Sequence, residues 1–252
     1  MTSIKKTICA LFGAFTIFVL TFGAAHAGDP IAQRGPTVVE LYTSQGCSSC
    51  PPADALLGRL AKMDNILALS FHVDYWDYIG WKDPFAAPMN SQRQREYSRV
   101  IRKSYVYTPQ MIIHGLTETT GSNERSIRAS IEHAKLAPDV PIKMERQASG
   151  DLKIRVARGR EPGMASVWLV FFDRIHVTKI RRGENRGVKL NNYNVVRMMK
   201  KIGEWKGQRL ALTISAEELK DHKGQGCAVF LQSAQKGPIL GAASIQLAEN
   251  TN

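Results

Sequence analysis

A Cys-x-x-Cys pair lies between a predicted buried strand and a predicted helix, and it constrains this chain more than any other feature. Residues 36–42 (PTVVELY) are short, β-branched and bounded by turn-forming residues, which is typical of a buried strand. The two prolines that follow Cys50 are compatible with the first turn of a helix, where backbone N–H groups have no acceptor. The helix predicted over residues 51–63 presents an apolar face made of Leu56, Leu57, Leu60 and Met63.

The segments that follow predict a right-handed parallel crossover and then a mixed unit. Periodicity and capping residues locate these segments. The expected elements are strands at 65–73, 110–113 and 116–119, the last at an edge, and helices at 89–103 and from Ser122 or Asn123 onward. The predicted order over residues 36–138 is therefore βαβαββα.

Residues 137–141 (APDVP), with two prolines in five residues, form the best linker in the chain. Beyond the linker the apolar period changes from 3.6 to two. Strands are expected at 152–159, 165–172, 209–215, 227–233 and 239–247. The predicted fold class is α/β, with an N-terminal domain at 36–138 and a mostly β, sandwich-like domain at 141–248.

The N-terminus has the pattern of a secretory signal peptide. Lys5 and Lys6 precede an apolar run that ends at Phe22, and Ala25-His26-Ala27 is a small-x-small cleavage site. The run is about fifteen residues long, short of the roughly 20 that cross a bilayer. We predict a signal peptide at 1–27 with cleavage after Ala27, so the protein would be periplasmic or secreted. A retained membrane helix is the alternative.

The net charge of +12 falls to +10 after cleavage, because the signal segment carries two lysines and no acidic residue. A basic exported protein favours anionic envelope surfaces or acidic proteins as partners, whereas nucleic acid is poorly placed. The basic residues are scattered over both halves, which indicates a generally basic surface.

Three cysteines remain after cleavage, since Cys9 leaves with the signal peptide. A disulfide between Cys47 and Cys50 closes too short a loop to stabilise the fold much, so a working dithiol is the better interpretation in an oxidising compartment. Cys227 begins an apolar run and is predicted to be a buried strand thiol. At a helix start, the thiolate of Cys47 would be stabilised as the nucleophile, and Cys50 would resolve the mixed disulfide.

The element order, YTSQGCSSCPP and YTPQMIIHG together resemble a thioredoxin fold over residues 36–138. The resemblance implies a cis peptide bond before Pro109, with the backbone of Thr108 presented to an extended substrate. It also implies a buried acid before the motif, for which Glu40 is the candidate. Glu40 lies one residue further from Cys47 than that pattern requires, so the alternative is a carboxylate paired with an arginine or lysine. The Ser-Ser pair between the cysteines leaves the direction of electron flow open.

Nearly the whole mature chain resembles an exported bacterial family catalogued as domain of unknown function 1223 and described as secreted and thioredoxin-like. The similar stretches are VVELYTSQGCSSCPPAD, FHVDYWDYIGWKDPF, YTPQMIIHG and RGENRGVKLNNYNVVR. The second stretch follows a strand at the sheet end that bears the cysteines, so His72, Asp74 and Trp76 are candidates for a substrate groove, with a self-packed loop as the alternative. The last stretch is read as a structured hairpin loop or as a partner surface.

The sequence therefore predicts a thiol-disulfide oxidoreductase without a cofactor, acting on the thiols and disulfides of exported proteins together with an unknown redox partner. A binding module without redox chemistry is one alternative. A copper-handling protein is another, since thiolates suit Cu(I), but the cysteine spacing and the lack of a second ligand cluster argue against a metal site.

Overall fold

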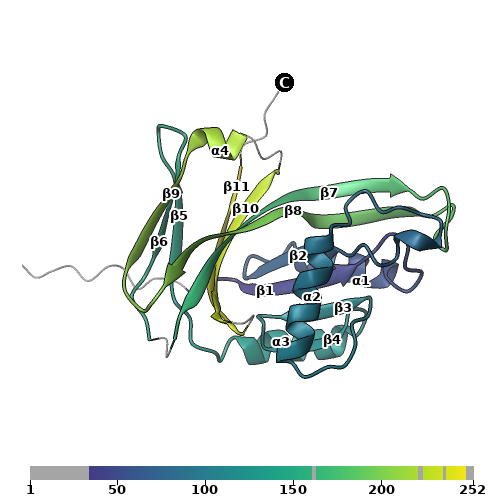
Figure 1. The fold of residues 1–252 in the computed structure, drawn as a ribbon, viewed down its shortest axis with the longest axis horizontal. Helices are drawn as coiled ribbons and strands as arrows, with labels where there is room; N and C mark the ends of the chain where they lie inside the picture. The colour runs from purple at the N-terminus through teal and green to yellow at the C-terminus, as the bar shows by residue number, and fades with distance from the viewer. Residues whose placement is uncertain (1–33, 161–162, 221–223, 235–236, 248–252) are drawn as a thin grey trace, which may run out of the picture. The chain divides into compact units, whose positions relative to one another are not determined.

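The computed structural model describes residues 34–160, 163–220, 224–234 and 237–247, and its centre is an eight-stranded mixed sheet (Figure 1). The strands lie in the order β11-β10-β7-β8-β2-β1-β3-β4. Their bounds are β1 Thr37–Thr43, β2 Ile66–His72, β3 Gln110–Ile113, β4 Thr117–Thr120, β7 Ala165–Lys179, β8 Lys189–Trp205, β10 Gly226–Ser233 and β11 Ile239–Gln246. A smaller sheet holds β5 Ile142–Arg146, β6 Leu152–Val156 and β9 Leu210–Ile214 in the order β5-β6-β9.

Helices cover both faces of the first half of the large sheet (Figure 1). They are α1 Pro51–Leu60, α2 Pro88–Val100 and α3 Glu124–Ala134, with a 3₁₀ turn, η1, at Asp77–Ile79 and a short α4 at Ala216–Lys220. Leu41 of β1 packs in one core with α1 and α3, whereas Tyr42 packs in another with Tyr97 of α2. Because neighbouring residues of a strand point to opposite faces, β1 serves both layers.

The order of elements up to α3 is the predicted one, apart from the added η1. β1 runs parallel to β2 and antiparallel to β3, and β4 lies at the edge. Asn123 caps α3 by accepting a hydrogen bond from the Ser126 amide. Cys227 is fully buried in β10, as predicted, and burial raises the pKa of its thiol to about 12.

The second half is mostly β, but its long strands extend the first sheet. β7 and β8 form a hairpin of 15 and 17 residues, and Ser70 of β2 pairs in parallel with Val195 of β8. The small sheet packs on the other end of this sheet, where side chains such as Ile154 and Phe171 share a core. The sequence predicted only residues 165–172 of the hairpin and missed β8.

All described residues belong to one compact unit. The architecture is therefore mixed α/β with one large and one small sheet, and the domain boundaries at 138 and 141 stay a prediction. The predicted signal peptide at 1–27, with cleavage after Ala27, lies outside the described residues. Within the described ranges no helix is long and apolar enough to cross a bilayer.

Candidate functional site

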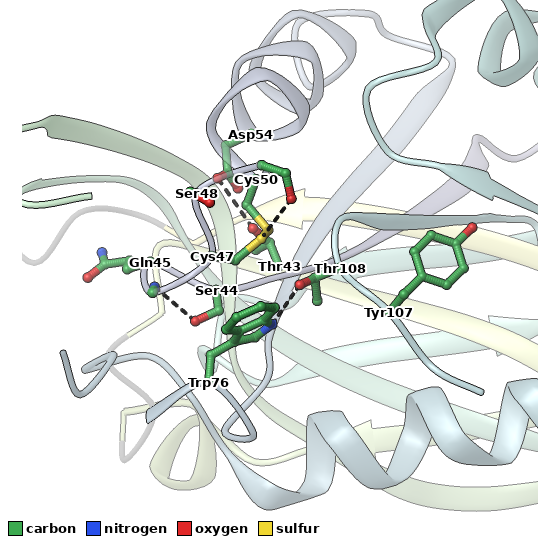
Figure 2. Close-up of a disulfide and its surroundings, with 12 residues drawn as sticks. Thr43, Ser44, Gln45, Cys47, Ser48, Cys50, Asp54, Trp76, Tyr107 and Thr108 are labelled. Atoms are coloured by element: carbon green, nitrogen blue, oxygen red, sulfur yellow. Dashed lines mark hydrogen bonds between the residues drawn. A yellow bond between two sulfur atoms is a disulfide. The ribbon is translucent and has the colours of Figure 1, made fainter. Parts of the chain in front are cut away.

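Cys47 and Cys50 form a disulfide in the turn between β1 and α1 (Figure 2). Cys50 is the N-cap residue of α1, and Pro51 is the first helical residue, as predicted, so Cys47 lies three residues before the N-cap. The two sulfur-bearing residues are almost fully buried, while Ser48 and Ser49 between them are exposed. The Ser49 hydroxyl lies 3.3 Å from the Cys47 sulfur and is placed to donate a hydrogen bond to it.

The tip of the β7–β8 hairpin, residues 180–188, forms hydrogen bonds to the turn that carries the cysteines. The Asn185 side-chain amide donates to the carbonyl oxygens of Gln45 and Cys47, both at 2.9 Å. Glu184 accepts a hydrogen bond from the Ser48 amide at 3.2 Å. The polar stretch 182–197 is thus a structured hairpin, and part of it forms one wall of the disulfide site.

Gln45 connects three segments below the disulfide. Its backbone N–H donates to Asp83 at 2.8 Å, and its side-chain amide donates to Asn192 of β8 at 2.9 Å. Its side-chain oxygen accepts from the Trp81 indole at 3.1 Å. Each of these three partners is distant from Gln45 in sequence. The bonds satisfy buried polar groups of Gln45 and hold the turn in place.

His72 and Asp83 form a fully buried pair, with Nδ1 of His72 2.7 Å from the Asp83 carboxylate. Burial opposes ionisation of Asp83, but the charge and hydrogen bond of His72 and two backbone N–H groups outweigh it, so its pKa is lowered. His72 is therefore committed to Asp83 and does not line a groove, contrary to the sequence prediction.

The other two predicted groove residues have different surroundings. Asp74 accepts a hydrogen bond of 2.5 Å from Ser91 of α2, so it anchors the loop. Trp76 donates from its indole nitrogen to the Thr108 hydroxyl at 2.7 Å (Figure 2). The backbone of Gly46 packs against Trp76, since a Cβ there would lie 3.4 Å from the Cβ of Trp76. Trp76 therefore spans from the cysteine turn to Thr108.

The Thr108–Pro109 peptide bond is cis, as the sequence predicted. Pro109 lies near the first turn of α1, because a Cβ on Gly121 would be 3.0 Å from both Pro109 and Ala53. Pro109 and Thr108 therefore border the same end of the helix as the disulfide.

Glu40 lies on the face of β1 that packs on α2, away from α1. Arg93 binds its carboxylate through two hydrogen bonds of 2.7 and 2.8 Å, and the Tyr97 hydroxyl donates at 2.6 Å. All three side chains are buried. The structure thus shows the arginine-paired alternative, and this carboxylate does not face the cysteines.

Asp54 is the buried carboxyl group that does lie beside the cysteines (Figure 2). It is one helical turn after Cys50, and the Thr43 hydroxyl donates to it at 3.3 Å. Burial raises its pKa to about 7, which the charge of His72 and the hydroxyl of Thr43 only partly offset. Sequence analysis missed Asp54, because an acid in the first turn of a helix normally only complements the helix dipole.

The site is built from four distant stretches of sequence. The turn at 44–50, the loop at 73–87, the Thr108–Pro109 bond and the hairpin tip all meet around one disulfide. These are parts of the four stretches that carried the family resemblance, although Gln45, Asp83, Asn185 and Asn192 were not predicted as site residues. No group of three or more His, Cys, Asp and Glu side chains able to hold a metal occurs in the described part of the chain.

The chain is similar to one protein family and to two solved structures. Residues 38–232 match the family model described as "Protein of unknown function (DUF1223)". The crystal structure of protein AGR_C_4864 from Agrobacterium tumefaciens is 32% identical, with a TM-score of 0.77 over 88% of this chain and 99% of that one. HBP35 of Porphyromonas gingivalis, 9% identical, is similar in fold alone, with a TM-score of 0.56 over 86% of this chain and 76% of that one. No curated protein is similar in sequence.

Proposed function

The chain belongs to the DUF1223 family, and from the site that its residues build we propose that it is a thiol-disulfide oxidoreductase acting through Cys47 and Cys50. The observation that carries the proposal is the disulfide at the N-cap of α1, held by side chains from three other segments. A bridge that closes so short a loop adds little stability. The polar residues around it are better explained by chemistry at the sulfur atoms.

A thioredoxin-like reading of residues 36–138 supports the same function. The order β1-α1-β2-α2-β3-β4-α3 and the position of Pro109 beside the start of α1 are the features that argue for it. Thr108 would present its backbone to an extended client, while Trp76 fixes its side chain.

The proposed reaction is disulfide exchange with assigned roles. In the reduced protein the Cys47 thiolate attacks a client disulfide, forms a mixed disulfide and releases one client thiolate. Cys50 then attacks the Cys47 sulfur, restores the bond between the two cysteines and releases the second client thiolate. The reverse sequence transfers a disulfide to the client. Ser49 stabilises the Cys47 thiolate by its hydrogen bond.

We further propose that the chain is exported, with cleavage after Ala27, and works in the periplasm or outside the cell. Its clients would be exported proteins with thiols or disulfides, and a separate redox partner would return the pair to its starting state. The basic composition, with a net charge of +12, is suited to anionic envelope surfaces.

Trapping in the native compartment tests the function. A Cys50→Ala variant cannot resolve the mixed disulfide and should accumulate adducts through Cys47 that disappear under reducing conditions. The matched controls are Cys47→Ala, which should form no adducts, and Cys227→Ala, which should behave as the wild type because the Cys227 thiol is fully buried in β10. A binding module or a metal carrier predicts no adducts with Cys50→Ala, and that result would refute the proposal.

A further inference from the structure

Three buried polar atoms near the disulfide lack a hydrogen-bond partner among the described residues: Oδ1 of Asp54, Nε2 of His72 and Nδ2 of Asn192. All three side chains are shielded from solvent, with exposures of 3%, 0% and 0%. Native proteins leave few such atoms unpaired, and those that remain call for an explanation in catalysis or in bound water. Asp54 and His72 are neighbours, because His72 pairs across the sheet with Thr43, which donates a hydrogen bond to Asp54, and Asn192 acts on Asp54 as well.

Asp54 is positioned by the same helix that carries the resolving cysteine. Its backbone N–H donates to the Cys50 carbonyl at 3.1 Å. Residues four apart on a helix lie on one face, with their Cβ atoms roughly 5–6 Å apart. Figure 2 draws the bond between Thr43 and Asp54 together with the disulfide at the start of the same helix.

The pair behind Asp54 has a defined protonation pattern. Asp83 is an acceptor for both the Gln45 amide and Nδ1 of His72, so the imidazole carries its proton on Nδ1. Nε2 of His72 then has no hydrogen-bond partner among the described residues. When His72 carries a positive charge, that charge favours the ionised form of Asp54, which links the two groups electrostatically.

We propose that Asp54, backed by the His72–Asp83 pair, is the proton acceptor for the Cys50 thiol. This inference rests on the proposed function and assigns a further residue to its resolving step. Cys50 attacks the Cys47 sulfur of the mixed disulfide, the bond between Cys47 and the client breaks, and its electron pair leaves with the client sulfur, which is reduced. The Cys50 proton passes to the Asp54 carboxylate, and in the reverse direction Asp54 returns it.

The surroundings of Asp54 suit a group that exchanges a proton near neutral pH. Burial raises its pKa to about 7, opposed by His72 from β2, Thr43 from β1 and Asn192 from β8, and reinforced by the charge of Asp83. A carboxyl group poised in this way is partly ionised at the pH where thiols begin to dissociate. Glu40 is paired with Arg93 on the opposite face of β1 and does not face the cysteines.

Ellman's reagent, 5,5′-dithiobis(2-nitrobenzoate), separates the two steps without any client protein. The reduced protein, carrying Cys227→Ala to remove the third thiol, should release one thionitrobenzoate in a phase that depends on reagent concentration. Cys50 should release the second in a phase that does not. In Asp54→Asn the second phase should slow by about tenfold or more at neutral pH, with the first phase unchanged. Glu132→Gln, which removes an exposed carboxyl group of α3, is the control and should leave the second phase unaltered.

Equal slowing of both phases, or of neither, would overturn the proposal. Titration of the Asp54 carboxyl carbon by NMR in the wild type provides a readout without substitution. Its pKa should differ between the oxidised and the reduced protein, and an identical titration in both states would also overturn the assignment. Both measurements are independent of clients, so absence of trapped adducts would refute the proposed function while leaving this proton transfer testable.

Discussion

The side-chain amide of Asn185, at the tip of the β7–β8 hairpin, hydrogen-bonds to the carbonyl oxygen of Cys47, 138 residues earlier in the chain. With a second bond to the Gln45 carbonyl, it closes the hairpin over the turn that carries the disulfide. Only 1% of Cys47 is exposed. If the pair reacts as we propose, we expect that the hairpin tip must move before a client sulfur reaches Cys47.

Removal of this contact should make the disulfide more accessible. In Asn185→Ala both bonds to the turn are lost, and reduction by a small phosphine should be several-fold faster than in the wild type. The free energy of unfolding should fall by about 1–3 kcal/mol, because two buried carbonyl groups lose their donor. Asn191→Ala, which changes an exposed residue of β8, is the control and should change neither quantity. An unchanged reduction rate in Asn185→Ala would contradict a gating role.

The Ser49 hydroxyl should set the reactivity of Cys47. Ser49→Ala removes the hydrogen bond to the sulfur, so the first phase of the reaction with Ellman's reagent should slow about three- to tenfold at neutral pH. Ser48→Ala changes the other exposed serine, whose backbone rather than side chain bonds to Glu184, and should react as the wild type does. Equal rates for all three proteins would exclude thiolate stabilisation by Ser49.

The buried pair of Glu40 and Arg93 should be structural. Glu40→Gln leaves a buried guanidinium without its counter-charge and should lower the free energy of unfolding by about 3–5 kcal/mol, measured in urea. Glu132→Gln breaks an exposed pair with Lys135 and should cost about 0–1 kcal/mol. A Glu40→Gln protein of undiminished stability would show that the ion pair does not hold β1 to α2.

The raised pKa of Asp54 makes stability depend on pH in a defined direction. Because its pKa rises from 3.8 to about 7 on folding, the native state favours the protonated carboxyl. The contribution of this protonated carboxyl to the stability of the fold is complete below pH 3.8 and is lost as pH rises toward 7. Asp54→Asn, with the disulfide intact, should therefore gain stability relative to the wild type between about pH 4 and about pH 8. A difference that is constant with pH would contradict the raised pKa.

Local patterns predicted the first half of the fold because its elements obey them. β3 has the predicted bounds, the prolines after Cys50 start α1, and apolar periodicity located the helices. Strand β8 was missed, since Asn191, Asn192 and Asn194 interrupt any apolar alternation. Asn192 accepts a hydrogen bond from Gln45, and Asn194 donates one to the Ala68 carbonyl. These tertiary contacts hold the strand where apolar alternation is missing.

The sequence prediction chose Glu40 and not Asp54 as the buried acid near the cysteines, for a related reason. A shift of one residue along a strand moves a side chain to the opposite face, and this put Glu40 on the α2 side of β1. No periodicity marks Asp54 as special, because its burial depends on β1, β2 and β8 closing over the first turn of α1. The functional meaning of these residues appears only when distant segments are brought together.

The reduction potential of the Cys47–Cys50 pair, measured by equilibration with glutathione, tests the central claim most directly. A working dithiol should have a potential between about −120 and −270 mV, the range of disulfide oxidants and reductants. A value below about −300 mV would identify a structural bridge that resists reduction and would contradict the account.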